Sequence, residues 1–221
     1  MSGAVISLDV GGTLVRTSGP SLAALLLAAS PLQAPAARSV IRRELYTRPR
    51  ITDEVIAAVC TGLQIPRSAF PRQHAPVEVS LQSTTPTVLR QLSRSAKLVT
   101  LSNVTCLDDD PVLHDLLAPW ISRHFPSSRL GYAKPDPAAF HAVAAACGVP
   151  TTTLVHVGDD WECDIVGAAR AGAVAVWLAE GRPIPDVDLL ADGNVLITHD
   201  LPTAARRVGH YLKTRRQRSR R

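Results

Sequence analysis

The feature that most constrains the fold is a series of short, mostly apolar runs that each end in polar or charged residues. The clearest examples are Val5–Leu8 before Asp9, residues 97–101 before Ser102, and residues 153–157 before Gly158 and Asp159. Such runs are typical of buried parallel strands. Helical segments lie between them, so the alternation predicts right-handed crossovers and a doubly wound α/β sheet with parallel strands.

Predicted helices and further strands fill the intervals between these runs. We expect helices at residues 86–95, from Pro111 to before Pro119, at 137–148, at 163–171 and from Pro202 onward. Asp136 is a natural N-cap, because Pro137 suits the first helical position. Additional strands are expected at residues 129–130, Val174–Leu178 and Val195–Thr198.

A helical insertion interrupts the alternation after the first strand. Val55, Ile56, Val59, Cys60 and Leu63 recur with a period of 3.6 residues, which indicates a helix with Thr52 as N-cap. Residues 77–81 alternate between apolar and polar side chains, a pattern that is compatible with either a strand or a helix. The sequence therefore predicts an α/β core from residues 1–16 and 85–221, with a helical cap from residues 17–84 inserted into it.

Composition is typical of a globular cytoplasmic protein. Hydrophobic residues make up 46% of 221 residues, enough for a sizeable core. The longest apolar stretch, Leu22–Ala29, is too short to cross a bilayer, and residues 1–9 do not resemble a secretory signal. The four cysteines show no metal-binding spacing, so reduced thiols are expected. Arg outnumbers Lys 21 to 3, which we interpret as a bacterial coding bias.

The net charge of +5 comes from the C-terminal end of the chain. Residues 206–221 carry eight positive charges and no acid, so the rest of the protein is mildly acidic. Residues 213–221 are expected to be a flexible basic tail. Binding to RNA or to an acidic partner is an alternative. Because Tyr211 is the nearest aromatic residue to the tail, no stacking platform is indicated, and nucleic acid is not expected as a partner.

A lysine and several carboxylates follow the predicted strands. Lys134 stands in Gly-Tyr-Ala-Lys-Pro-Asp-Pro, and Asp159 and Asp164 follow it, while Asp9 ends the first strand. The carboxyl ends of parallel strands meet at one edge of a sheet. An acid available as nucleophile, an acid pair for a divalent cation and a neutralising lysine suit phosphoryl transfer, in which the protein mainly positions groups and balances charge.

Taken together, these motifs resemble the haloacid dehalogenase (HAD) superfamily of hydrolases, most of whose members are phosphatases. The resemblance covers the whole chain and implies a Rossmann-like core with a helical cap of the C1 type. It rests on four motifs in order: Asp9-Val10-Gly11-Gly12-Thr13, Ser102, Lys134-Pro135-Asp136-Pro137, and Gly158-Asp159 with Asp164.

The resemblance also implies the roles of individual residues. Asp9 would attack phosphorus and form an aspartyl-phosphate, and Ser102, Asn103 and Lys134 would bind the phosphoryl group of a small phosphorylated metabolite. Mg²⁺ would be the cofactor, because it prefers oxygen ligands. The implied ligands are Asp9, the backbone carbonyl of Gly11, Asp159 and Asp164. Helix capping would explain Asp159 or Asp164 singly, but not both together with Lys134.

Gly11 departs from the pattern of the family. Phosphatases of this superfamily usually carry a second Asp there, which acts as general acid and base and contributes about 10²- to 10⁴-fold to the rate. A cap residue or a water molecule replaces it, or the leaving group needs little protonation, or the protein is slow or inactive. The polar cap residues considered as replacements are Arg42, Arg43, Glu44, Tyr46, Arg48 and Arg50, with Arg16 at the entry to the cap.

Three other functions compete with the phosphatase. A metal-independent dehalogenase would also lack the second Asp, but such enzymes do not keep the metal-binding acids. The segment Leu8 to Thr13 is similar to the phosphate loop of glucokinase-type sugar kinases, which leaves Lys134 and the late acids unexplained. A non-catalytic binding or regulatory protein on the same scaffold is supported by Gly11 alone.

His156 is expected to be a packed core residue, and Trp161 to line or cover the pocket.

Overall fold

A six-stranded parallel sheet forms the centre of the protein. The computed structural model describes residues 4–73, 75, 77–191 and 193–218. The strand order is β5-β4-β1-β6-β7-β8, and every neighbouring pair is parallel. The strands are β1 (Val5–Leu8), β4 (Lys97–Ser102), β5 (Ile121–Pro126), β6 (Leu154–Gly158), β7 (Val174–Leu178) and β8 (Val195–Thr198). This topology confirms the predicted doubly wound α/β fold.

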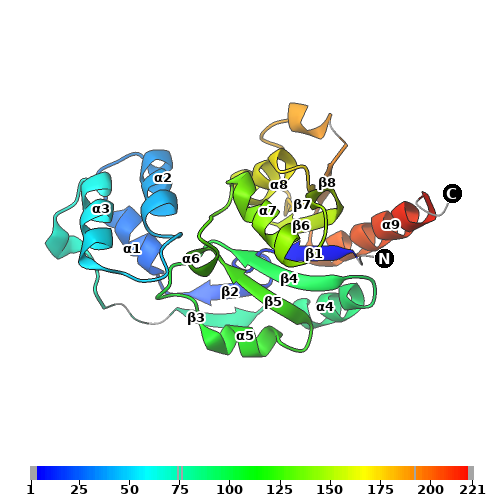
Figure 1. Ribbon diagram of the computed structural model, residues 1–221, viewed down its shortest axis with the longest axis horizontal. Coiled ribbons are helices and arrows are strands. Elements are labelled where there is room, and N and C mark those ends of the chain that lie inside the picture. The colour runs from blue at the N-terminus through cyan, green and yellow to red at the C-terminus, as the bar shows by residue number, and fades with distance from the viewer. Residues whose placement is uncertain (1–3, 74, 76, 192, 219–221) are drawn as a thin grey trace.

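Helices cover both faces of the sheet. Figure 1 shows α7 (Pro137–Ala146) and α8 (Gly167–Arg170) on one side, and α4 (Thr85–Ser93) on the other. The long helix α9 (Leu201–Arg218) packs against α4, and α5 (Pro111–Leu117) contributes Leu117 to the same apolar core. Successive residues of β1 alternate between the two cores: Val5 joins one, and Ile6 and Leu8 join the other. Burial on both faces explains why the strands consist mainly of apolar residues.

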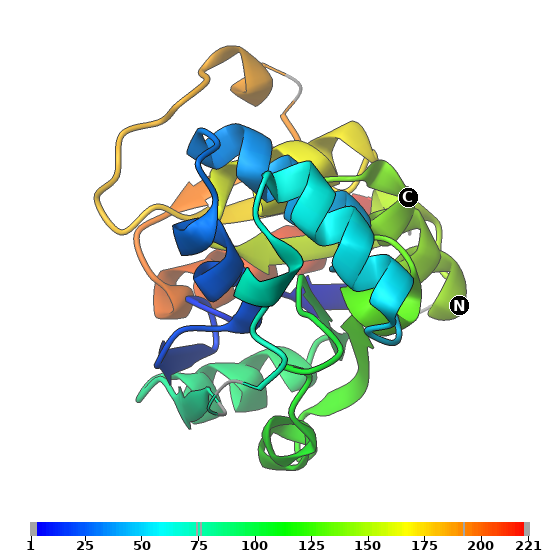
Figure 2. The same cartoon turned by 90° about the vertical axis from the view of Figure 1, so that its left-hand side faces the viewer.

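Three helices form a separate cap with its own apolar core. They are α1 (Leu22–Ala29), α2 (Ala34–Glu44) and α3 (Asp53–Leu63), followed by a 3₁₀ turn, η1 (Arg67–Ala69). The Thr52 side chain accepts a hydrogen bond from Val55 N at 3.3 Å, which confirms the predicted N-cap. Figure 1 shows the cap helices standing off from the helices that flank the sheet. Figure 2, which faces this side, shows them in front of the strands.

A two-stranded antiparallel sheet connects the cap to the core. It pairs β2 (Val15–Ser18), which leads into the cap, with β3 (Glu78–Leu81), which leads out of it. The ambiguous segment at residues 77–81 is therefore mainly a strand. The Gln82 side chain donates to the Gly12 carbonyl at 2.9 Å, and the Thr85 hydroxyl donates to the Leu14 carbonyl at 2.7 Å. These bonds attach the return strand to the loop that follows β1.

Two expectations about secondary structure are wrong. Residues 129–130 are not a strand but belong to the short helix α6 (Ser127–Leu130), and the strand is β5. Because β5 is an edge strand with exposed Ser122 and Arg123, it lacks the apolar run that reveals the buried strands. The helix expected from Cys163 begins instead as a π-helical turn, η3 (Trp161–Val166), and continues as α8.

Residues 213–218 of the basic tail are helical, because α9 continues to Arg218, and residues 219–221 lie outside the described part of the chain. Two 3₁₀ turns, η2 (Thr151–Thr153) and η4 (Asp188–Leu190), complete the described elements. Across the residues that the structure describes, no helix combines the length and apolarity needed to cross a membrane.

Candidate active site

The Lys134 ammonium joins two carboxylates at the carboxyl edge of the sheet. Its Nζ atom lies 2.6 Å from Oδ1 of Asp9 and 2.6 Å from Oδ1 of Asp164. Lys134 is 2% exposed, so the ion pairs are shielded from water. Asp159 completes the group: ligand oxygens of Asp9, Asp159 and Asp164 all lie within 4.8 Å of one another. Asp9, Lys134, Asp159 and Asp164 therefore meet around one point, as expected for groups at the carboxyl ends of neighbouring parallel strands.

Three neighbouring strands position these groups. Asp9 follows β1 and donates its backbone N–H to Val157 of β6 at 2.9 Å. Ser102 is the last residue of β4, and Asp159 follows β6 directly. The Trp177 indole donates to the Asp159 carbonyl at 3.0 Å, which fixes the backbone of this acid. The site therefore depends on β1 lying between β4 and β6.

Two glycines allow the backbone to approach the acids closely. Gly12 has a φ of +77°, and a Cβ there would lie 2.8 Å from the Asp159 carboxylate oxygens. A Cβ on Gly158 would collide with the Asp164 carboxylate. Both glycines are therefore required by the packing of the site, which the sequence pattern did not reveal.

The π-helical turn after Asp160 directs Asp164 toward the lysine. The Asp160 carboxylate accepts a hydrogen bond from Cys163 N at 2.8 Å and caps the turn. Its own backbone N–H donates to Oδ2 of Asp164 at 3.0 Å. Asp160 thus acts on the site through Asp164. Trp161 packs edge-on against Trp177 with ring centroids 4.8 Å apart, and it is absent from the walls of the active-site cavity.

Asn103 fixes the segment that carries Lys134. Its amide Nδ2 donates to the Lys134 carbonyl at 2.7 Å, and its Oδ1 accepts from the Lys134 N–H at 2.8 Å. This pair of bonds couples the end of β4 to the lysine loop. Asn103 also lines the cavity above the acids, and Ser102 lies beside it.

His156 is buried, as expected, and also touches the site. Its Nε2 lies 3.1 Å from Oδ1 of Asp164, and its Nδ1 lies 3.0 Å from the Ser7 hydroxyl. The tautomer that donates from Nε2 to the carboxylate accepts from Ser7 at Nδ1. Burial lowers the pKa of His156, so the neutral imidazole is favoured. Sequence reasoning missed this role, because a histidine inside a strand carries no sign of its partner.

The carboxylates outnumber the cations at the centre of the site. Burial, together with the neighbouring Asp164 and Asp159, raises the pKa of Asp9 to about 7 despite the Lys134 ammonium. Burial and Asp164 also raise the pKa of Asp159. For Asp164, burial is outweighed by Lys134 and His156, which hold its pKa well below the usual range. Three acids around one lysine leave an excess of negative charge, which suits a divalent cation with oxygen ligands.

A cavity of about 370 Å³ lies between these groups and the cap. From the cap it is lined by Leu27, Arg38, Ile41, Arg42 and Tyr46. Arg42 also pairs with Glu162 of the core, with Nη2 and Oε1 3.3 Å apart. Burial raises the pKa of Tyr46 to about 12, so its phenol stays protonated.

The polar cap residues considered from the sequence divide into two groups. Arg42 and Tyr46 reach the active-site cavity, whereas Arg43 and Arg48 pair with Glu44. Arg16 and Arg50 are exposed and do not line the cavity. Arg38 was missed, although it lies one helical turn before Arg42 on the same face of α2.

Comparisons with known proteins agree with this geometry. A family model described as HAD-hydrolase-like matches residues 131–204, which include Lys134, Asp159 and Asp164. A crystal structure of a 2-haloacid dehalogenase from Pseudomonas syringae superposes with a TM-score of 0.59 at 21% identity, covering 93% of this chain and 99% of that one. The C-terminal part of the core thus matches a HAD-hydrolase-like family model, and the chain as a whole has the fold of that dehalogenase.

Two further matches are phosphatases by name. A phosphoserine phosphatase from Thermus thermophilus is 37% identical over 73 residues, which are 31% of this chain and 29% of that relative. The match thus spans less than a third of the relative. A predicted phosphoglycolate phosphatase from Haemophilus somnus superposes with a TM-score of 0.59 at 21% identity, covering 91% of this chain and 96% of that one. At this identity the structural matches show that the HAD fold extends over core and cap.

Proposed function

We propose that this protein is a phosphatase of the HAD superfamily that depends on Mg²⁺ and acts on a small phosphorylated metabolite through Asp9. The observation that carries the proposal is the set of three carboxylates, from Asp9, Asp159 and Asp164, within 4.8 Å of one another. Cleavage of a carbon–halogen bond has no use for the two late acids. Phosphoryl transfer does, because the charge on the transferring group must be balanced.

The residues at the site fit a magnesium ion. Asp159 and Asp9 would be direct ligands together with the Gly11 carbonyl. Both oxygens of Asp164 already accept hydrogen bonds, whereas Asp159 receives only a weak one from Thr13 at 3.4 Å, so Asp159 has more capacity to bind a cation. When bound, Mg²⁺ would neutralise charge on the phosphoryl oxygens and orient them for in-line attack.

Asp9 would supply the nucleophile. Lys134 holds its Oδ1 atom, which leaves Oδ2 to attack phosphorus. A bond then forms between this oxygen and phosphorus while the bond from phosphorus to the leaving oxygen breaks. Water attacks the aspartyl-phosphate in the second step, releases inorganic phosphate and regenerates the carboxylate. Ser102 is suited to donate its hydroxyl to a phosphoryl oxygen, and Arg38 and Arg42 add positive charge from the cap.

Because Gly11 has no side chain, the oxygen of the leaving group lacks the usual proton donor. A Cβ at Gly11 would meet nothing within 4 Å, so the position is open and can admit water or part of the substrate. The proton then comes from water or from the substrate, or the leaving group departs without one. Among substrates that make no specific contacts beyond the phosphoryl group, we expect those with good leaving groups, such as acyl phosphates, to react fastest.

The proposal is tested by assaying the purified protein with acetyl phosphate and p-nitrophenyl phosphate, with Mg²⁺ and with EDTA. We expect phosphate release that requires Mg²⁺ and is absent in Asp9→Asn. Chloride release from 2-chloropropionate that persists in EDTA would instead establish a dehalogenase. Failure of the protein to turn over any substrate of a broad phosphate panel would favour a binding protein.

A further inference from the structure

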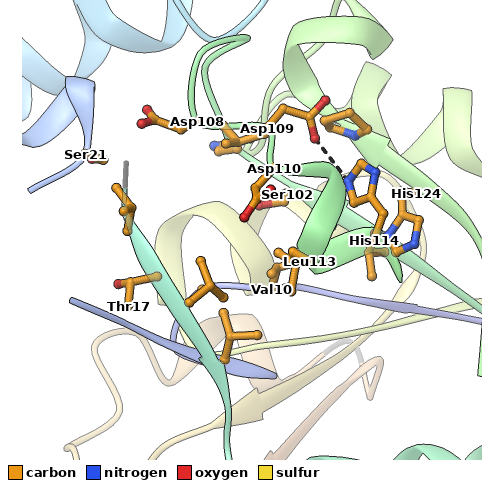
Figure 3. A pocket seen from close by; sticks show the side chains of 18 of the residues that line it. Val10, Thr17, Ser21, Ser102, Asp108, Asp109, Asp110, Leu113, His114 and His124 are labelled. Carbon is orange, nitrogen blue, oxygen red and sulfur yellow. Dashed lines mark hydrogen bonds and ion pairs between the residues drawn. The ribbon is translucent and has the colours of Figure 1, made fainter. Parts of the chain in front are cut away.

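A second cavity, of about 360 Å³, adjoins the active site. It lies between the two-stranded β2–β3 sheet, the start of α1, the loop after β4 and helix α5 (Figure 3). Gly11, Ser102 and Asn103 line both this cavity and the one above the acids. The two cavities therefore meet beside the nucleophile, and each is large enough for part of a small molecule.

One wall of the second cavity is the inner face of the two-stranded β2–β3 sheet. Thr17 and Val79 are cross-strand partners, and both line the cavity. Val15 and Val77 also line it, as the two-residue period of a strand requires. Ser80, which follows Val79 and has the opposite orientation in the strand, is exposed and absent from the cavity wall. Val10 and Leu113 extend the apolar surface from the core.

The opposite wall is acidic. Figure 3 shows Asp108, Asp109 and Asp110 along one side of the cavity, with Val10 and Thr17 below them and His114 and His124 at one end. Asp109 pairs with Arg129 at 2.7 Å and with His114 at 3.0 Å. Within the described residues, Asp110 forms no ion pair; its carboxylate accepts a hydrogen bond from Val112 N at 2.9 Å.

His124 does not offset this negative charge. Burial and the stacked His114 ring lower the pKa of His124 to about 4, so its imidazole is neutral at neutral pH. Its Nδ1 lies 2.9 Å from the Thr100 hydroxyl. The cavity thus combines apolar walls with the carboxylate of Asp110, which has no ion-pair partner among the described residues, and this favours a ligand that has an apolar body and a positively charged end.

The open space beside Gly11 links the second cavity to the site at which phosphoryl transfer would occur. A larger side chain there would project into space that is now free of neighbours within 4 Å. We infer that the second cavity receives the leaving group of the substrate, and that this group is a short aliphatic alcohol carrying a protonated amine that faces Asp110. This inference rests on the proposed phosphatase function. It explains why the open position adjoins a cavity and not a packed wall.

Specificity for the leaving group is the first test. We expect kcat/KM for 6-aminohexyl phosphate to exceed that for hexyl phosphate by about tenfold. Asp110→Asn should reduce this ratio toward one, because Asn still caps α5 but carries no charge. A ratio near one in the native protein, or an unchanged ratio in Asp110→Asn, would overturn the inference.

Filling the cavity is the second test. Val79→Trp should lower kcat/KM for the two hexyl esters at least tenfold more than for acetyl phosphate, which has no body to place in the cavity. Ser80→Trp is the matched control, since it adds the same ring to the outer face of the same strand. Thr17→Trp, at an exposed position across the strand pair, provides a second filled variant if Val79→Trp folds poorly. Equal losses for all three substrates would contradict the assignment.

Binding measurements separate the inference from the proposed function. Calorimetry of 6-amino-1-hexanol with the Asp9→Asn protein should show one site, lost in the Val79→Trp double variant and kept with Ser80→Trp. Mg²⁺-dependent hydrolysis of acetyl phosphate without such binding would overturn the cavity assignment and leave the proposed function standing. Binding of the alcohol without turnover of any phosphate would overturn the proposed function.

Discussion

Lys134 and Asp164 form a buried ion pair, with Nζ and Oδ1 2.6 Å apart and both side chains almost fully removed from water. The same ammonium holds Asp9, so one cation serves two acids that lie far apart in the sequence. A buried ion pair adds little net stability, but removing one partner leaves an uncompensated charge in the interior. The lysine is therefore needed for the fold of the site before any substrate arrives.

Replacing this lysine should destabilise the metal-free protein. We expect Lys134→Met to lower the free energy of unfolding by about 3–5 kcal/mol, because Asp9 and Asp164 remain buried without their cation. Urea unfolding in EDTA at neutral pH measures the loss. Lys97→Met, at the exposed start of β4, is the control and should stay within about 0.5 kcal/mol of the native protein. A similar small effect for both variants would show that the pair is not buried in solution.

Removing Asp159 should abolish the response to magnesium. We expect Asp159→Ala to lose most phosphatase activity, by about 10²-fold or more, since both a ligand and its charge are gone. A Mg²⁺ titration of phosphate release should then show no saturation in the range that activates the native protein. Asp186→Ala, in an exposed loop, serves as control. Retention of a normal titration in Asp159→Ala would remove this residue from the metal site.

Restoring an acid at Gly11 should raise activity. We expect Gly11→Asp to increase kcat for hexyl phosphate by about 10- to 100-fold, and to increase kcat for acetyl phosphate less, because the poorer leaving group gains more from protonation. The position tolerates a side chain, since a Cβ meets nothing within 4 Å. Gly11→Asn, which has the same size but no acid, should give no gain. An unchanged or lower rate in Gly11→Asp would refute this account of the missing proton donor.

Magnesium should stabilise the protein more at pH 8 than at pH 5.5. The folded-state pKa of Asp9 is raised from 3.8 to about 7, so the metal-free folded protein binds a proton that the unfolded chain releases. The stability linked to Asp9 is therefore present at low pH and is lost as pH rises toward 7. A cation that binds the ionised carboxylate reverses this loss. Melting temperatures with Mg²⁺ and with EDTA measure the difference, which should shrink in Asp9→Asn; equal shifts at both pH values would contradict it.

His124 should produce an acid-sensitive component of stability. Its folded-state pKa is lowered from 6.5 to about 4, so the unfolded chain binds a proton more readily than the folded one between these values. The stability linked to His124 is therefore present above pH 6.5 and is lost as pH falls toward 4. We expect His124→Asn, which can still bond to Thr100, to show a shallower loss over this range in urea unfolding. If the free energy of unfolding falls with pH equally in the two proteins, a group other than His124 causes the acid sensitivity.

Part of the candidate site follows from local sequence patterns. Asp9, Ser102 and Asp159 each end an apolar run, and parallel strands bring such ends to one edge, so their proximity was predictable. The lysine loop was predictable as well, because Asp136 and Pro137 mark the start of a helix. Periodicity also indicated the cap helices, since their apolar residues face a core of their own.

Other features depend on contacts between distant segments. The bonds of His156 to Ser7 and Asp164, and those of Asn103 to Lys134, join residues on different strands and loops. The second cavity depends on the two-stranded β2–β3 sheet, whose strands lie about 60 residues apart in the chain. Period and composition determined which residues are buried and where strands end. Only the tertiary structure decided which polar groups share one low-dielectric site, because hydrogen bonds, burial and the resulting pKa shifts depend on partners that no local pattern specifies.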